Sequence, residues 1–426
     1  MPIQDTQKLS KTEIKIFSLS AIGGALEFYD FIIYVFFAQI LAQLFFNTTS
    51  VVSNLLLSFS VFATGYIARV FGGLVFSHFG DRYGRKKSFA LTLFLMAFPT
   101  LCIGLLPTYS QIGIIATILL VICRILQGFA IGGEIPCSLT FVYEHASYKN
   151  RAYACSLLFC GLVMGIFLGS LVSAIATKSI STNSLMDWGW RIPFIFGGVL
   201  GFVGVYLRKY LNETPEFQKI YAIKALKVPV IQVLKEFLFS TINSITVILS
   251  IAVSVTLYLL YLPTYLHIYF NFPSSRLLVI NSIAVVILCL FIVLFGKLSK
   301  FVGPRKIFNF GLILFIIFAY PVLHQLQSNN YLALYLIYAH AIIATSAVTA
   351  AGVFLVADSY PTQVRYSGVS LSYNIAFGVF GGFTPFISTY LIKVTNSRYS
   401  PAYYMTGICI LALGFSLLPS KKNTRV

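Results

Sequence analysis

The sequence contains few charged residues, and very few of these are acidic. Among 426 residues there are 12 Asp and Glu against 30 Lys and Arg, and charged residues make up 10% of the chain while hydrophobic residues make up 58%. With a mean hydropathy of +0.87, the chain has too little polar surface to cover a soluble globule of its size. We therefore expect most of it to face lipid.

Motifs for several kinds of chemistry are also missing. The chain has no Gly-x-x-x-x-Gly-Lys-Ser/Thr loop for the phosphates of ATP, and the glycine-rich turn at Gly80 does not match one. The seven cysteines show no Cys-x-x-Cys and no Cys/His ligand spacing, so we interpret them as apolar packing residues. The acidic residues in apolar stretches have no nucleophile or metal-ligand set beside them. We expect neither an enzyme nor a cofactor.

The chain does contain many long apolar stretches. Stretches of about 20 residues are long enough to cross a bilayer as helices. We count twelve, centred near Tyr29, Ala68, Phe98, Gly128, Met164, Leu200, Ser254, Leu288, Phe315, Thr345, Phe380 and Ile410. The polar N-terminal segment has no cleavage-site pattern, so we expect the first helix to be retained. The prediction is an all-α membrane protein of twelve transmembrane helices.

The helices divide into two groups of six. We predict a cytoplasmic N-terminus at 1–17, a six-helix bundle at 18–210, a cytoplasmic linker at 211–236, a second six-helix bundle at 237–419 and a cytoplasmic tail at 420–426. Two loops recur about half a chain apart, which indicates that the bundles are pseudo-symmetric. The turn Gly80-Asp81-Arg82-Tyr83-Gly84-Arg85-Lys86 corresponds to Gly296–Lys306, and the pair Glu144/Arg151 corresponds to Asp358/Arg365.

The net charge of +18 follows the predicted topology. If both termini are cytoplasmic, the opposite side holds only five cations, which are Lys178, Arg191, Arg276, Lys393 and Arg398. Cytoplasmic loops of membrane proteins are enriched in Lys and Arg, so this asymmetry fixes the orientation and makes a nucleic-acid partner unnecessary. The cytoplasmic cations are Lys8, Lys11, Lys15, Arg82, Arg85, Lys86, Lys87, Lys149, Arg151, Arg208, Lys209, Lys219, Lys224, Lys227, Lys235, Lys297, Lys300, Arg305, Lys306, Arg365, Lys421, Lys422 and Arg425.

Several motifs carry a resemblance to a known family. They are Leu26-Glu27-Phe28-Tyr29-Asp30-Phe31, Arg124-Ile125-Leu126-Gln127-Gly128, Trp188-Gly189-Trp190-Arg191, Glu213-Thr214-Pro215-Glu216-Phe217 and Tyr360-Pro361-Thr362-Gln363-Val364-Arg365. Over almost its whole length the chain resembles the metabolite:proton symporter branch of the major facilitator superfamily, and within that branch it is most similar to bacterial proline/betaine transporters. The resemblance implies the major facilitator fold, with the solute site between the bundles near the midplane.

The chain departs from the family pattern in two places. Ser77 stands where a glycine is usual, and Lys300 stands at the position corresponding to Asp81. Lys300 removes a carboxylate from the second-half turn, so we place the main cytoplasmic latch in the first half. Osmosensing relatives carry a long C-terminal extension with heptad character. The given sequence ends at Val426, so we expect uptake without that form of osmotic control.

Ionisable residues at membrane depth indicate proton coupling, because each is costly unless it faces a cavity or a partner. Glu27 and Asp30 are three residues apart and should share one helix face near the midplane. We hypothesise that one of them exchanges the proton and that Arg124 supplies a permanent counter-charge. Glu134 would relay protons or close the cytoplasmic route. The alternative is a static network of ion pairs.

A second set of charges is expected to form a cytoplasmic gate whose ion pairs hold one state of an alternating-access cycle. The set comprises Arg69, Asp81, Arg82, Gly84, Arg85, Lys86, Glu144, Arg151, Asp358 and Arg365. A topology signal would need only cations, so the carboxylates favour a gate. For Arg69, nearer the motif turn, static structural pairing is the better interpretation.

Aromatic residues near the buried carboxylates suggest the solute. Phe28, Tyr29, Phe31 and Tyr34, with Gln127, could bind a zwitterion whose ammonium group lies on ring faces and whose carboxylate meets Arg124. We therefore predict a monomeric symporter of the inner (cytoplasmic) membrane, driven by the proton gradient, that imports a small zwitterion such as proline or glycine betaine. The alternatives are a dicarboxylate such as α-ketoglutarate held by Arg124 and Arg69, a uniporter, or a transport-dead sensor.

Overall fold

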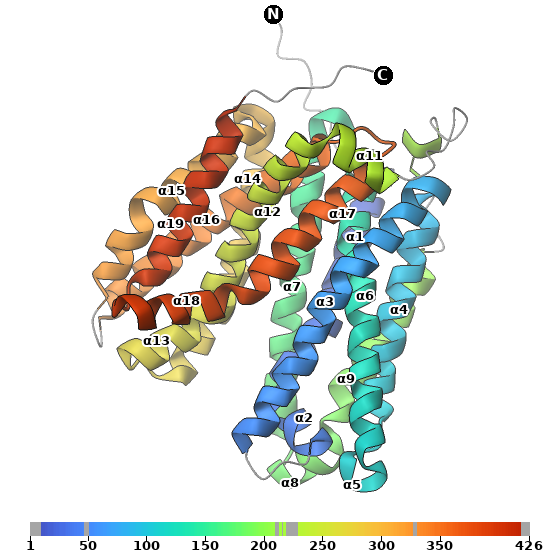
Figure 1. The fold of residues 1–426 in the computed structure, drawn as a ribbon, viewed down its shortest axis with the longest axis vertical. Helices are drawn as coiled ribbons and strands as arrows, with labels where there is room; N and C mark the ends of the chain where they lie inside the picture. Colours follow the sequence, from blue (N-terminus) through green and yellow to red (C-terminus); the bar gives the residue numbers. More distant parts are fainter. Residues whose placement is uncertain are drawn as a thin grey trace, which may run out of the picture.

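The computed structural model describes residues 10–46, 51–208, 213–214, 216–218, 229–326 and 330–418 of the chain. Within these ranges every regular element is a helix, which confirms the all-α class (Figure 1). The predicted tail at 420–426 and most of the predicted linker lie outside the described residues. So do eight of the predicted cytoplasmic cations: Lys8, Lys209, Lys219, Lys224, Lys227, Lys421, Lys422 and Arg425.

The helices of the first half form one bundle, shown in blue to green in Figure 1. They are α1 (Lys11–Phe36), α2 (Ala38–Phe45), α3 (Val51–Tyr83), α4 (Arg85–Leu105), α5 (Tyr109–Ile112), α6 (Ile114–His145), η1 (Tyr148–Asn150), α7 (Arg151–Ser179), α8 (Thr182–Ser184), η2 (Leu185–Gly189) and α9 (Arg191–Arg208). The first helix starts at Lys11, seven residues before the predicted bundle, because Ser10 and Glu13 form a reciprocal capping box.

The second bundle, yellow to red in Figure 1, follows a short helix inside the predicted linker. That short helix is α11 (Pro229–Glu236). The elements of the bundle are α12 (Leu238–Val255), η3 (Thr256–Tyr261), α13 (Leu262–Phe270), α14 (Ser274–Val302), α15 (Pro304–His324), α16 (Tyr331–Asp358), α17 (Arg365–Ile375), η4 (Ala376–Gly381), α18 (Gly382–Thr395) and α19 (Ser400–Leu417). The π-helical segments η3 and η4 each join two α-helices into one longer path.

The number of membrane-spanning helices can be counted only among the described residues. Ten helices of the described chain are long and apolar enough to cross a membrane, and one bent pair within 182–206 would make eleven. The 33-residue helix α3 is about 50 Å long at 1.5 Å per residue, but the side chains at 51–60 and 62–63 lie outside the described residues. The count of twelve and the cytoplasmic side of the termini stay predictions.

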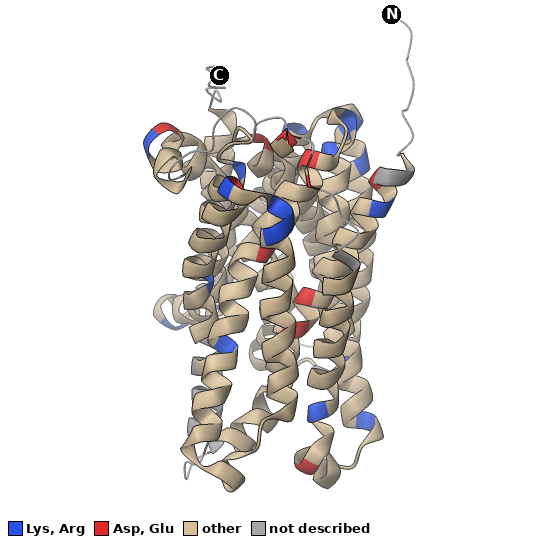
Figure 2. Ribbon diagram, turned by 90° about the vertical axis from the view of Figure 1, so that its right-hand side faces the viewer, with Lys and Arg blue, Asp and Glu red and all other residues tan. Residues whose placement is uncertain are grey.

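The two bundles meet mainly through α3 with α17 and through α7 with α14. Their ribbons lie together at the end where α1 begins and α19 finishes, here called the termini end, and diverge towards the other end (Figure 1). One apolar core contains buried residues of both bundles, whereas a second core contains residues of the first bundle alone. Figure 2 shows charged residues of both signs gathered near the termini end.

Candidate functional site

A buried polar cluster lies inside the first bundle. The side chains of Glu27, Arg124 and Gln127 have no solvent exposure, and Asp30 is 1% exposed. Arg124 Nη1 donates to Gln127 Oε1 at 2.7 Å, and Gln127 Nε2 donates to Thr100 Oγ1 at 2.7 Å. The cluster therefore joins the central part of α6 to α4.

Glu27 and Asp30 face different surroundings although both lie on α1. Asp30 points at α9, since a Cβ atom added at Gly197 would lie 2.4 Å from its Oδ1, and it also lies near Thr100. Glu27 acts electrostatically on Tyr373 of α17, in the other bundle. The structure thus places Asp30 within the first bundle and Glu27 near the interface between the bundles.

The four aromatic residues proposed for the solute do not converge. The guanidinium of Arg124 lies 4.8 Å from the ring centre of Phe31 and 4.4 Å from that of Tyr34. Tyr29 donates to the carbonyl oxygen of Pro193 at 2.8 Å, and Phe28 packs towards Gly165 of α7. The ring faces of Phe31 and Tyr34 thus contact a cation of the protein itself.

Arg69 spans the two bundles at mid-helix. Its Nε donates to Asn374 Oδ1 at 2.8 Å, and its guanidinium lies 5.0 Å and 5.5 Å from the ring centres of Tyr373 and Phe377. Twelve residues of α3 separate Arg69 from Asp81, which is about 18 Å along a helix. Arg69 therefore lies far from the turn with which it was grouped, and its aromatic and amide partners were not foreseen.

Two arginines, one from each bundle, share Glu144 at the termini end. Arg85 lies 2.9 Å from Asp81 and 3.3 Å from Glu144, and it donates to the carbonyl oxygen of Thr362 at 2.6 Å. Arg365 Nη1 lies 2.9 Å from Glu144 Oε1. Because Asp81, Arg85 and Glu144 are all buried, the bundles are held together here by ion pairs away from solvent.

Asp81 also binds the first turn of α17. The backbone N–H of Ser367 donates to Asp81 Oδ2 at 2.8 Å, and that of Tyr366 donates to Oδ1 at 3.3 Å. The first amides of a helix lack partners within the helix and carry partial positive charge, so a carboxylate is stabilised there. This contact crosses between bundles.

Two further carboxylates, Glu213 and Glu216, complete the network. Glu213 accepts hydrogen bonds from the backbone N–H groups of Arg85 and Lys86, both at 3.1 Å, next to Gly84 with its φ of 111°. Glu216 pairs with Arg151 and lies 2.7 Å from Arg365. The sequence analysis used this motif only for the resemblance to the family and predicted no role for its two acidic residues. Because the chain has only 12 acidic residues, two in one motif were a usable signal of a functional contact.

The partners of Glu216 set its protonation. Burial alone would raise the pKa of Glu216, but the guanidinium of Arg365, with smaller contributions from Arg151 and the Thr362 hydroxyl, holds the pKa below its ordinary value. The carboxylate is therefore the form that the closed network stabilises.

In the repeated pairs Glu144/Arg151 and Asp358/Arg365, the contacts reach the opposite bundle and do not stay within each pair. Asp358 accepts from the hydroxyl of Tyr143 at 2.5 Å, and Arg151 donates to the same hydroxyl at 3.1 Å. Arg365 instead reaches Glu144 of the other bundle.

Two more cations of the predicted loops have aromatic neighbours. Lys300 contacts the Asn150 amide oxygen and lies 5.3 Å from the Tyr153 ring centre, so it too crosses between bundles. The guanidinium of Arg82 lies 5.3 Å from the ring centre of Tyr83.

Glu134 lies between the two charged regions. It is fully buried on α6, ten residues from both Arg124 and Glu144, which corresponds to about 15 Å each way along a helix. The hydroxyl of Thr92 donates to its Oε2. A relay between the two charged regions, the role predicted for Glu134, would need a position of this kind.

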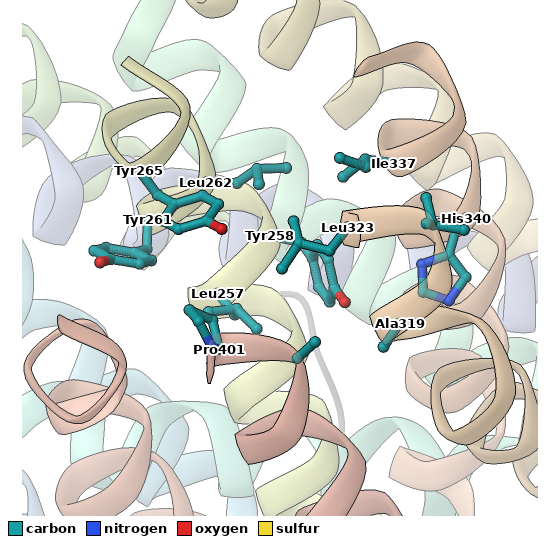
Figure 3. Close-up of a pocket in the computed structure, with 12 residues that line it drawn as sticks. Leu257, Tyr258, Tyr261, Leu262, Tyr265, Ala319, Leu323, Ile337, His340 and Pro401 are labelled. Carbon is teal, nitrogen blue, oxygen red and sulfur yellow. The ribbon is translucent and has the colours of Figure 1, made fainter. Parts of the chain in front are cut away.

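A separate pocket lies inside the second bundle. Figure 3 shows Tyr261 and Tyr265 on one side, His340 on the other and Tyr258 between them. No charged side chain is among the described residues that line it. The pocket therefore does not extend the polar cluster of the first bundle.

Comparison with known proteins identifies the family. The chain is 33% identical over 417 residues to a putative proline/betaine transporter of Staphylococcus aureus, covering 96% of this chain and 87% of that protein. Residues 17–227 match the family model described as sugar (and other) transporter, and residues 277–425 match that of the major facilitator superfamily. The chain belongs to the major facilitator superfamily. It is also 31% identical over 415 residues to the proline/betaine transporter of Escherichia coli, covering 94% of this chain and 82% of that one.

Solved structures show the same fold. The proton:xylose symporter XylE bound to 6-bromo-6-deoxy-D-glucose aligns with a TM-score of 0.78 at 16% identity, covering 95% of this chain and 94% of that chain. A partially occluded inward-open form of XylE from E. coli aligns with a TM-score of 0.67 at 19% identity, covering 98% and 100%. This superfamily member is thus a membrane transporter and a multi-pass protein of the inner membrane.

Proposed function

We propose that this transporter is a proton-coupled symporter that imports a small zwitterionic solute such as proline or glycine betaine. The observation that carries the proposal is the buried cluster of Glu27, Asp30 and Arg124, because charges at membrane depth are costly and are retained where they act on an ion or substrate. The names of the relatives from S. aureus and E. coli, both proline/betaine transporters, support the choice of solute.

The proton would be carried by Asp30 or Glu27. Asp30 lies near Thr100, which is hydrogen-bonded to Gln127 and through it to Arg124, so a change in the charge of Asp30 acts close to the cation that meets the solute. Glu27, which faces Tyr373 of the other bundle, is placed to respond when the bundles move. Burial and a nearby guanidinium shift a carboxyl pKa in opposite directions, so movement of the bundles can load and unload the proton.

The termini end would be the cytoplasmic side, as the distribution of Lys and Arg predicts. The ion pairs of Arg85 and Arg365 with Glu144 then act as a cytoplasmic gate that is closed in this structure. Opening requires Arg365 to leave Glu144, and Asp81 to release the first turn of α17. The static alternative predicts no such exchange.

The solute site needs revision from the sequence prediction. The ring faces of Phe31 and Tyr34 already contact Arg124, so a zwitterion would bring its carboxylate to Arg124 and its ammonium to Glu27, or displace Arg124 from the rings. Gln127 would then orient Arg124.

A dicarboxylate such as α-ketoglutarate is the second candidate. Tyr66 lies within the electrostatic range of both Arg69 and Arg124, and each arginine is almost fully buried. Two cations beside one tyrosine would suit two carboxylates.

Uptake into proteoliposomes tests these alternatives. Labelled proline, glycine betaine and α-ketoglutarate are supplied with and without an inward proton gradient. Gradient-driven accumulation of a zwitterion is the expected result. Accumulation of α-ketoglutarate alone would favour the dicarboxylate, equilibration that ignores the gradient would mean a uniporter, and binding without uptake would mean a sensor.

A further inference from the structure

Tyr366 of the second bundle is inserted into the first. Its side chain has no solvent exposure, although it lies at the start of α17. A Cβ atom added at Gly80 of α3 would lie 2.3 Å from its ring. The ring therefore fills a space in the first bundle that only a glycine leaves open.

The hydroxyl of Tyr366 is bound inside the same space. It donates to the carbonyl oxygen of Gly133 at 2.8 Å and lies 3.3 Å from the hydroxyl oxygen of Ser88. The backbone N–H of Tyr366 lies on Asp81. Ring, hydroxyl and backbone are thus all held by the first bundle.

Glu134 lies directly behind this side chain. It follows Gly133 in the sequence, it acts electrostatically on the Tyr366 hydroxyl, and it is bound by Thr92 of α4. Ser88 and Thr92 are four residues apart and so lie on one face of α4, and Arg85 precedes them on that face. Polar groups therefore lead along α4 from Glu134 to the ion pairs at the termini end, and Tyr366 stands across them.

We infer that Tyr366 is a removable plug that separates Glu134 from the cytoplasm while the bundles are closed at the termini end. When α17 moves away, the ring leaves the space beside Gly80 and water reaches Ser88 and Thr92. The O–H bond of a protonated Glu134 then breaks, its proton passes to that water, and a carboxylate remains. Tyr366 acts as a positioning residue, because it controls access and carries no proton itself.

This inference rests on the proposed proton-coupled function, but its test needs no solute. Purified full-length transporter is reconstituted with a pH-sensitive dye inside the vesicles, and a proton gradient is imposed without solute. We expect Tyr366→Ala to raise the rate of proton entry about tenfold. This factor corresponds to a loss of about 1.4 kcal/mol from the free energy that favours the closed state. Tyr366→Phe keeps the ring and should remain near the wild-type rate.

Three further variants make the test specific. Gly80→Ala should leak like Tyr366→Ala, because the added methyl group displaces the ring without removing it. Tyr360→Ala is the matched control, since the buried Tyr360 ring packs on Gly368 and its hydroxyl bonds to Ser372 and Thr241, all within the second bundle; it should not leak. Glu134→Gln combined with Tyr366→Ala should return proton entry to the wild-type rate.

Two results would overturn the plug: no leak in either Tyr366→Ala or Gly80→Ala, although both proteins remain monodisperse, or a leak that Glu134→Gln does not reduce. Failure of the wild type to accumulate any solute against its gradient would instead reject the proposed symport, and it is measured in a separate assay.

Discussion

Glu144 is the residue on which closure of the termini end depends most. It lies within ion-pair distance of Arg85 and Arg365, and Thr214 donates to it at 2.6 Å. Removing one partner from a buried ion pair leaves an uncompensated charge, which costs more than the pair itself contributes.

We therefore expect Glu144→Gln to destabilise the protein by about 3 kcal/mol and to lower transport. Thermal unfolding in detergent and solute uptake would measure the two effects. Glu236→Gln is the control, because Glu236 is exposed on α11 and bonds only to Gln232 among its described neighbours. Equal stability of the two variants would mean that Glu144 is not the centre of the network.

Asp30 and Glu27 should differ in their effects. A gradient of one pH unit can hold about tenfold accumulation when one proton accompanies each solute. We expect Asp30→Asn to abolish this accumulation while solute exchange continues, because the substitution removes the titrating carboxyl group and leaves the hydrogen bonds among Thr100, Gln127 and Arg124 in place.

Parallel measurement of gradient-driven uptake and exchange in Asp30→Asn, Glu27→Gln and Glu134→Gln would show which carboxyl group couples. Asp187→Asn, at an exposed position in η2, serves as the control. Unchanged accumulation in all three variants would reject proton coupling through these groups.

At the scale of whole helices, α7 and α14 form a seam that should report closure. Cys289 of α14 faces Cys160 of α7, with its Sγ 3.7 Å from the Cys160 carbonyl oxygen. We expect a short bifunctional thiol reagent to link the two helices and to reduce transport at least about tenfold, because a linked seam prevents the bundles from separating.

The measurement is uptake before and after treatment, together with mass spectrometry of the linked peptides. Cys160→Ser removes one end of the link and should keep its activity in the presence of the reagent. Inhibition that persists in Cys160→Ser would point to another cysteine.

Much of the fold and part of the candidate site could be predicted from the sequence. The remaining contacts could not be predicted, for a physical reason. Apolar length identified the helices, and the resemblance to the superfamily is confirmed. Spacing put Glu27 and Asp30 on one face of a helix, but α1 touches several neighbours. Only packing, such as Gly197 against Asp30, decides which neighbour each side chain meets.

Contacts between bundles were harder to predict for the same reason. The pairs Glu144/Arg151 and Asp358/Arg365 repeat in the sequence, but Arg365 binds Glu144 and Asp358 accepts from Tyr143, so both contacts cross the interface. The partners of Arg69, Asn374 and Tyr373, lie about 300 positions away in the chain. No local pattern signals such contacts.

For the molecule as a whole, closure of the termini end should depend on pH through Glu216. Its pKa is lowered from the ordinary value of 4.5, so its contribution to closure is fully present above that value and is lost as pH falls through the lowered pKa. The contribution of Glu216 to closure should therefore be insensitive to acidification from pH 7 to about 5. Linking of Cys160 to Cys289 as a function of pH would measure this.

Glu216→Gln removes the titrating group and should lose the pH dependence below about 5. Seam linking that weakens between pH 7 and 5 in the wild type would show that another group controls closure.

Glu216 binds Arg151 of the first bundle and Arg365 of the second at the same time. A substitution at this position removes two contacts together, and a compensating change at either arginine can restore only one of them. Second-site suppressors of a Glu216 defect should therefore be rare as single changes. They should arise instead as paired changes, one in each bundle.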